Sequence, residues 1–85
     1  MAYHVIIERT AKKQIVKLPN TYQTKILARI YDLANDPFQG KKLEGELTGQ
    51  YSVRVWPYRI IYQIYKRELI ISIIDVAHRQ GVYKS

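Results

Sequence analysis

The sequence predicts an α+β domain in the order β-α-α-β-β-β, with two N-terminal helices packed on one face of a small, mainly antiparallel, twisted sheet. Three observations predict this class. Apolar residues recur at helical spacing in the first half of the chain. Three runs rich in β-branched and aromatic residues fill the second half. The links between those runs are too short for a parallel crossover. At 85 residues, the chain has room for one domain, residues 1–85.

One strand and two helices are expected before residue 37. Residues 3–7 are short and β-rich, which predicts the first strand. From Thr10 the pattern is helical, with an apolar stripe of Ala11, Ile15 and Leu18. A second helix follows Pro19, with Asn20 or Thr21 expected as its N-cap, and it ends before Pro37. Its apolar stripe comprises Ile26, Leu27, Ile30, Leu33 and Ala34.

The second half reads as a polar connection, residues 38–50, followed by strands over residues 51–56, 58–65 and 69–76. Pro57 marks the first tight turn, because proline cannot donate to a sheet ladder. The last run is apolar on both sides, which is typical of a strand with a neighbour on each edge. The N-terminal strand is the one available to supply that second neighbour.

Alternation along the strands assigns side chains to two faces. The apolar set beginning with Val53 is expected under the helices, which leaves Arg54 on the opposite face, called here the open face. In the next run Tyr62 and the isoleucines make the better core, so Arg59 is expected to share the open face with Arg54.

The chain has 14 Lys and Arg and seven Asp and Glu, which gives a formal net charge of +7. Such a positive charge favours a polyanionic partner. Nucleic acid, an acidic protein and a membrane surface all fit, and simple solubility is the alternative. The absence of cysteine leans toward a reducing cytosol. The N-terminus lacks the features of a signal peptide, and no apolar stretch is long enough to cross a bilayer. We therefore expect a cytoplasmic protein without a membrane partner.

Several kinds of site are excluded by pattern. The sequence has no glycine-rich phosphate loop, no His-x-x-x-His pair and no Gly-x-Ser-x-Gly elbow, and its two histidines are isolated. No metal and no cofactor is therefore expected. The cationic and aromatic groups that remain as candidates are Arg54, Arg59, His78, Arg79 and Tyr83.

These groups suit chemistry on RNA. Arginine binds phosphate through a planar fork of donors, and several arginines can stabilise charge on a phosphorane-like transition state. Cleaving RNA without a metal also needs a base for the 2′-hydroxyl and an acid for the leaving 5′-oxygen. Tyr83 and His78 are the available proton carriers, although a tyrosine can act as a base only if positive charge lowers its pKa.

Each candidate also has a structural interpretation. Arg54 and Arg59 can be solvated strand residues, and His78 a surface histidine. Trp56 can stack on a base, but packing at the turn is the commoner role. Lys12 and Lys13 fit the solvated side of the first helix.

The segment from Tyr51 to Tyr62, YSVRVWPYRIIY, resembles the signature hairpin of the RelE/ParE toxin superfamily. The end of the chain, from His78 to Tyr83, resembles the C-terminal basic and tyrosine motif of that superfamily. Leu43-Glu-Gly45 resembles its approach to the hairpin. The resemblance covers nearly the whole chain, and it implies the RelE-like microbial ribonuclease fold.

The resemblance also implies an activity. RelE-like members cut messenger RNA in the ribosomal A site by 2′-hydroxyl attack on the adjacent phosphate, whereas ParE-like members poison DNA gyrase and lack the C-terminal catalytic groups. Because His78, Arg79 and Tyr83 are present, we expect a metal-independent endoribonuclease of the RelE branch. Tyr83 would be the general base, with Arg79 as transition-state stabiliser or proton donor. Arg59 would clamp phosphate, and Arg54 would support the activated base.

Two departures from the pattern stand out. A basic residue often found two places before Arg54 is Ser52 here, and the spacing from Arg79 to Tyr83 is short. In some compact relatives a histidine near the position of His78 acts as the acid or base, so Tyr83 and His78 are both retained as proton carriers.

The resemblance implies partners as well. They are messenger RNA on the ribosome, with contacts to 16S ribosomal RNA, and a cognate antitoxin, while the free toxin is expected to be a monomer. Lys12, Lys13 and Trp56 join Arg54 and Arg59 as expected RNA contacts. Two alternatives stay open: a gyrase inhibitor, and a non-catalytic nucleic-acid-binding module that acts with its antitoxin.

Overall fold

The chain folds into two helices and a five-stranded sheet, and the computed structural model describes residues 2–78. The predicted α+β order is confirmed, with one short strand added inside the expected polar connection. The elements are β1 (His4–Ile7), α1 (Arg9–Val16), α2 (Asn20–Asn35), η1 (Pro37–Gln39), β2 (Lys41–Lys42), η2 (Gly45–Leu47), β3 (Gln50–Val55), β4 (Tyr58–Tyr65) and β5 (Ile70–His78).

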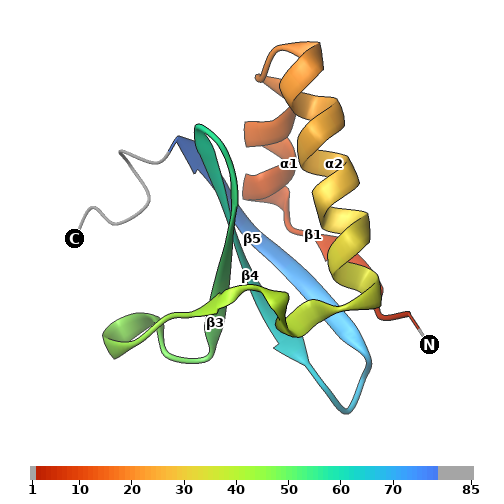
Figure 1. Cartoon of the computed structure of the whole chain (residues 1–85), viewed down its shortest axis with the longest axis vertical. Coiled ribbons are helices and arrows are strands. Elements are labelled where there is room, and N and C mark those ends of the chain that lie inside the picture. The colour runs from red at the N-terminus through yellow and green to blue at the C-terminus, as the bar shows by residue number, and fades with distance from the viewer. Residues whose placement is uncertain (1, 79–85) are drawn as a thin grey trace.

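The strands lie in the order β1-β5-β4-β3-β2. Only β1 and β5 run parallel among the described strands, and every other pair is antiparallel. The N-terminal strand is therefore the second neighbour of the last strand, as predicted. Figure 1 shows α1 and α2 together on one side of this sheet. Within residues 2–78, no helix combines the length and the apolar character that crossing a membrane requires.

The core lies between the helices and the sheet face that they cover. Tyr62 is its largest fully buried side chain, and Ile60 lies two residues away on the same face. Burying a side chain of this size contributes about 1.5–3 kcal/mol. The expectation that Tyr62 and the isoleucines form the core is confirmed. The buried cluster comprises Ala11, Ile15, Ile26, Ile30, Leu33, Val53, Ile60, Tyr62, Ile71, Ile73 and Val76.

Helix α1 closes an edge of β5 that β1 is too short to cover. The pairing of β1 ends at Ile7 opposite Ile73, so the last residues of β5 lack a strand on that side. There the Gln14 side chain accepts the Val76 N–H at 2.7 Å and donates to the Asp75 carboxylate at 2.5 Å. The Gln14 side chain thus pairs with a backbone N–H that would otherwise be exposed at the edge of the sheet.

The expected N-cap of the second helix is wrong. Helix α2 begins at Asn20 itself, Pro19 occupies the cap position, and no side chain caps the helix. The Pro19 carbonyl accepts the N–H of Gln23 at 3.0 Å, and Gln23 in turn donates its side-chain amide to the Leu18 carbonyl at 2.8 Å. Proline is compatible with this position because only its carbonyl is needed to accept the first hydrogen bond of the helix.

Tyr62 also fastens the segment that follows α2. Its hydroxyl donates to the Pro37 carbonyl at 2.7 Å and accepts the Gly40 N–H at 3.1 Å. Burial raises the pKa of Tyr62 to about 12, so the proton that makes the first bond is held firmly. A Cβ atom on Gly40 would overlap this hydroxyl, which explains glycine there. Together these contacts, called here the Tyr62 clasp, fix the chain where it enters β2.

Removing the hydroxyl with Tyr62→Phe should lower the free energy of unfolding by about 1–3 kcal/mol, because it leaves the Gly40 N–H and the Pro37 carbonyl without their partner. Urea unfolding measures the change. Tyr65→Phe is the matched control, since Tyr65 is 42% exposed on the same strand. Equal losses in the two variants would show that the clasp does not stabilise the fold.

The clasp should also make stability depend on alkaline pH. With the Tyr62 pKa at about 12 in the folded chain and 10.0 as its ordinary value, the unfolded chain loses this proton first. The unfolded state then binds fewer protons, so the contribution is complete below pH 10.0 and is lost as pH rises toward about 12. The stability difference between the unaltered chain and Tyr62→Phe isolates this effect, and it should shrink over that window. A difference that stays constant would contradict it.

Candidate functional site

The pairing register places Arg54 directly opposite Arg59 on neighbouring strands. The adjacent pairs, Val53 with Ile60 and Val55 with Tyr58, belong to the face covered by the helices. Because side chains alternate along a strand, the two arginines lie on the open face. The prediction that they share this face is confirmed.

A hollow on the open face surrounds the two arginines. Its volume is about 440 Å³, and β2 with the residues after it forms the opposite wall. Arg54 is exposed, whereas Arg59 is half-buried and has a buried Nε atom. The three cationic residues that the register places on the open face, Lys41, Arg54 and Arg59, outnumber the one carboxylate of the hollow, so the hollow suits an anion. Its lining residues are Lys41, Lys42, Leu43, Glu44, Arg54 and Arg59.

Sequence reasoning placed only Arg54 and Arg59 in the site and missed the four other lining residues, 41–44. These four lie in the stretch interpreted as a polar connection, where a strand of two exposed residues leaves no readable alternation. The face to which Lys41 belongs follows only from its pairing with Ser52, eleven positions later in the chain. The one local feature that could have indicated a basic site there is the pair of lysines directly after Gly40.

The structure does not place His78 beside the arginines. His78 pairs with Tyr58, and the two rings meet edge to face at 5.8 Å. Tyr58 packs on the core, so this pair belongs to the helix side of the sheet. The partner of Arg59 on β5 is Ala77. Arg79 and Tyr83 lie outside the described residues.

Of the other residues expected to contact RNA, one lies near the arginine pair and two lie on the other side of the sheet. Trp56 is 60% exposed at the tip of the β3–β4 hairpin, two residues beyond Arg54. Lys12 and Lys13 are exposed on α1, which packs on the opposite face of the sheet. The structure therefore brings Trp56 near the arginine pair, and Lys12 and Lys13 form a separate basic surface.

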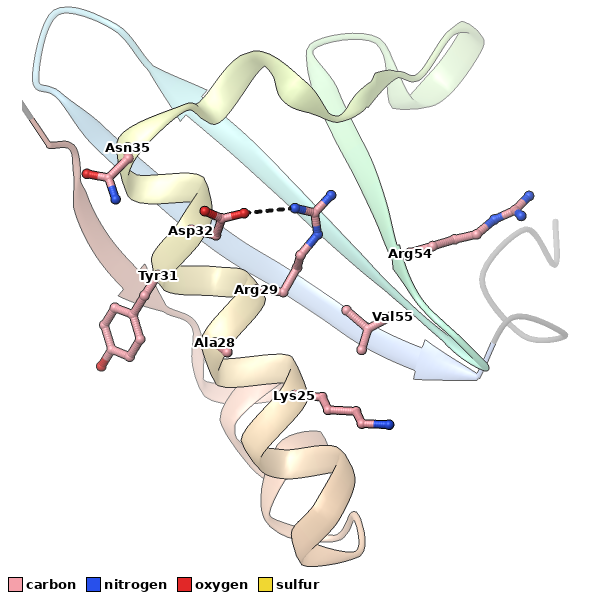
Figure 2. Close-up of a pocket in the computed structure, with 8 residues that line it drawn as sticks. All are labelled: Lys25, Ala28, Arg29, Tyr31, Asp32, Asn35, Arg54 and Val55. Carbon is pink, nitrogen blue, oxygen red and sulfur yellow. Dashed lines mark hydrogen bonds and ion pairs between the residues drawn. The ribbon is translucent and has the colours of Figure 1, made fainter.

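A second, larger hollow of about 680 Å³ lies along α2 and the outer edge of β3. Figure 2 shows Lys25 and Arg29 on the side of α2 nearer β3, and Tyr31 on the other side. Arg29 is already bound to the Asp32 carboxylate at 3.1 Å and to the Gln39 side chain. Arg54 lines both hollows, but only in the smaller one does it lie with a second arginine and with Lys41. The smaller hollow is therefore better suited to an anion.

The register sets two positively charged residues opposite each other. Like charges directly opposite each other on neighbouring strands destabilise a sheet. A phosphate between the two guanidinium groups would replace repulsion by charge-assisted hydrogen bonds to both. The same arrangement would stabilise the additional negative charge of a phosphorane-like transition state. The open face is thus a basic sheet surface whose charges suit an anion.

The fold and this open face define a class of small basic α+β proteins, and sequence comparison narrows that class to one family. The model of the family described as the ParE toxin of the type II toxin–antitoxin system, parDE, matches residues 5–83. The chain belongs to this family, and it is a type II toxin of the RelE/ParE superfamily.

Comparison with individual relatives supports this family assignment. Toxin RelG of Mycobacterium tuberculosis is 33% identical over 86 residues, covering 99% of each chain. The toxin–antitoxin complex RelBE2 of the same organism contains a chain that is 32% identical, with a TM-score of 0.87 and coverage of 93% of this chain and all of that one. The archaeal RelE–RelB complex from Pyrococcus horikoshii contains one that is 29% identical, with a TM-score of 0.80 and 96% and 100% coverage.

The repulsion between the paired arginines predicts a stabilising substitution. Arg54→Gln should raise the free energy of unfolding by about 0.2–1 kcal/mol at low salt, because Arg59 loses its like-charged neighbour. Added salt should reduce the gain by screening. Urea unfolding at two salt concentrations checks both points. Arg67→Gln is the matched control, since it removes the same charge from an exposed hairpin turn. An equal gain in the control would attribute the effect to net charge alone.

Proposed function

We propose that this toxin is a ribosome-dependent endoribonuclease that cleaves messenger RNA in the ribosomal A site and thereby inhibits translation. The observation that carries the proposal is the pairing of Arg54 with Arg59 on the open face. Two arginines paired on neighbouring strands can both direct guanidinium donors at one phosphodiester, which matches them in charge and in hydrogen-bond geometry. The similarity to RelE-type toxins supports the choice of RNA as the substrate.

In the proposed reaction a base removes the proton of a 2′-hydroxyl, whose oxygen attacks the adjacent phosphorus. The bond from phosphorus to the 5′-oxygen breaks, and an acid protonates that oxygen, leaving a 2′,3′-cyclic phosphate. Arg59 clamps the phosphate, and its half-buried position limits competition from water. Arg54 adds the second positive charge. No step requires a metal ion.

The remaining roles rest on the C-terminal motif. Tyr83 is the proposed general base and Arg79 the proposed transition-state stabiliser or proton donor. His78 is the alternative proton carrier, although its position beside Tyr58 favours Tyr83. The positive charge around the arginine pair has the sign needed to lower the pKa of a tyrosine brought near it.

The proposed partners follow from the same charges. Messenger RNA would occupy the open face, with Trp56 available to stack on a base. Lys12 and Lys13 would face 16S ribosomal RNA. A cognate antitoxin is proposed because similar chains occur in RelBE complexes, and an acidic segment would associate readily with a chain of net charge +7.

A second candidate is inhibition of DNA gyrase, the activity associated with ParE-like members. The description of the matching family model as a ParE toxin favours it. The presence of Arg79 and Tyr83 favours the ribonuclease instead.

Cleavage mapping of a translated messenger RNA, with and without ribosomes, tests the proposal. We expect cuts within A-site codons only when ribosomes are present, and no effect of the protein on gyrase supercoiling. Cuts without ribosomes would keep the nuclease and remove the ribosome dependence. Inhibited supercoiling without any cuts would replace the proposal by the second candidate.

Variants in the same assay test the assigned roles. Arg59→Gln, Arg79→Ala and Tyr83→Phe should each lower the cleavage rate by about 100-fold or more, since each removes charge stabilisation or proton transfer from the transition state. Arg67→Gln, which removes a charge from the exposed β4–β5 turn, should cleave at the unaltered rate. Circular dichroism of each variant checks that it is folded. Normal cleavage by folded Arg59→Gln would contradict the role of the arginine pair.

A further inference from the structure

The short strand β2 brings a third cation to the open face. We infer that Lys41 binds the phosphate next to the one held by Arg54 and Arg59, so that the site grips two successive phosphates of one RNA strand. This inference rests on the proposed function, since it names a further substrate-binding residue of the same site.

The face of Lys41 follows from the register. Lys41 pairs with Ser52, and Ser52 lies two residues before Arg54 on β3. Paired residues, and residues two apart on a strand, share a face of a sheet. Lys41 therefore lies on the open face with Arg54, and both line the same hollow. Lys42 pairs instead with Tyr51, whose ring stacks on Tyr62 on the helix side.

Lys41 supplies charge at a point of this face where β3 supplies none. Ser52 is only 5% exposed, and its short neutral side chain leaves the surface above it to the neighbouring strand. Across one strand spacing, the exposed Lys41 side chain can extend over that position.

The position of Lys41 suits a phosphate next to the one held by Arg54 and Arg59, and not that phosphate itself. Lys41 lies one strand across and two residues along from Arg54, which places their Cα atoms about 8 Å apart. Arg54 and Arg59 face each other directly and can share one phosphate. A ligand that spans all three must carry more than one phosphate group, as a nucleic-acid strand does. Glu44, the carboxylate of the hollow, is outnumbered by its cations.

The backbone of Lys41 is fixed from both sides. On one side the Tyr62 clasp holds Gly40, and on the other the Leu43 N–H donates to the Gln50 carbonyl at 2.9 Å. The Leu43 side chain is also buried. A flexible loop would have to be ordered when RNA binds, whereas this strand is ordered beforehand, and that lowers the entropic cost of the contact.

The test measures binding of a fluorescent RNA oligonucleotide with 2′-O-methyl groups, which prevent cleavage, over a series of salt concentrations. Lys41→Gln should weaken binding about tenfold at low salt, because it removes one charge-assisted contact. It should also reduce the slope of log affinity against log salt by about 0.7, the value for one phosphate contact on a single strand. Lys66→Gln, the same change in the exposed β4–β5 turn, should leave the slope unchanged.

Two further variants separate loss of contact from loss of structure. Lys41→Arg should keep the slope, and Ser52→Lys added to Lys41→Gln should restore it, because position 52 shares the face of position 41. An unchanged slope in Lys41→Gln would overturn the inference, as would an equal loss in Lys66→Gln. If Arg59→Gln loses binding while Lys41→Gln does not, the proposed function survives and the inference fails. If neither variant affects binding, both fail.

Discussion

The register between β3 and β4 is the constraint on which both the core and the site depend. It pairs Val53 with Ile60 under the helices and, one step along, Arg54 with Arg59 on the open face. A slip of one residue would turn each strand over, placing charge in the core and apolar side chains in solvent. The burial of Tyr62 and the isoleucines therefore stabilises the arrangement that holds two arginines against their own repulsion. The packing of the core thus fixes the position of both arginines on the open face.

Tyr62 connects the two sides of the sheet. Its ring belongs to the buried cluster, and its hydroxyl binds the main chain at Pro37 and Gly40, just before β2. The strand that follows adds a wall of the basic hollow, including Lys41. Hydrogen bonds made by Tyr62 in the interior therefore help to fix the position of Lys41 on the open face. Such rigid support is what a binding site requires.

Much of the fold was predictable because it rests on local periodicity. Alternation predicted the shared face of Arg54 and Arg59, and helical spacing predicted both helices. Features set by long-range contacts were not predictable in this way. The strand β2 has only two residues and exists through its pairing with β3, so Lys41 was missed. The C-terminal motif predicted a role for His78 in proton transfer. The face of the sheet on which His78 lies depends on the pairing of β5 with β4, which no local pattern defines. The cap lies at Pro19 and not at Asn20 because the first hydrogen bonds of α2 are accepted by the Pro19 carbonyl, which side-chain preference does not reveal.

An NMR titration of the labelled toxin with 2′-O-methyl RNA tests the proposal that RNA binds the open face through the arginine pair. We expect the largest amide shifts on β2, β3 and the start of β4, around Lys41, Arg54 and Arg59. Shifts concentrated on α1 and α2, with the open face unchanged, would contradict it and would place the nucleic-acid-binding surface on the helices.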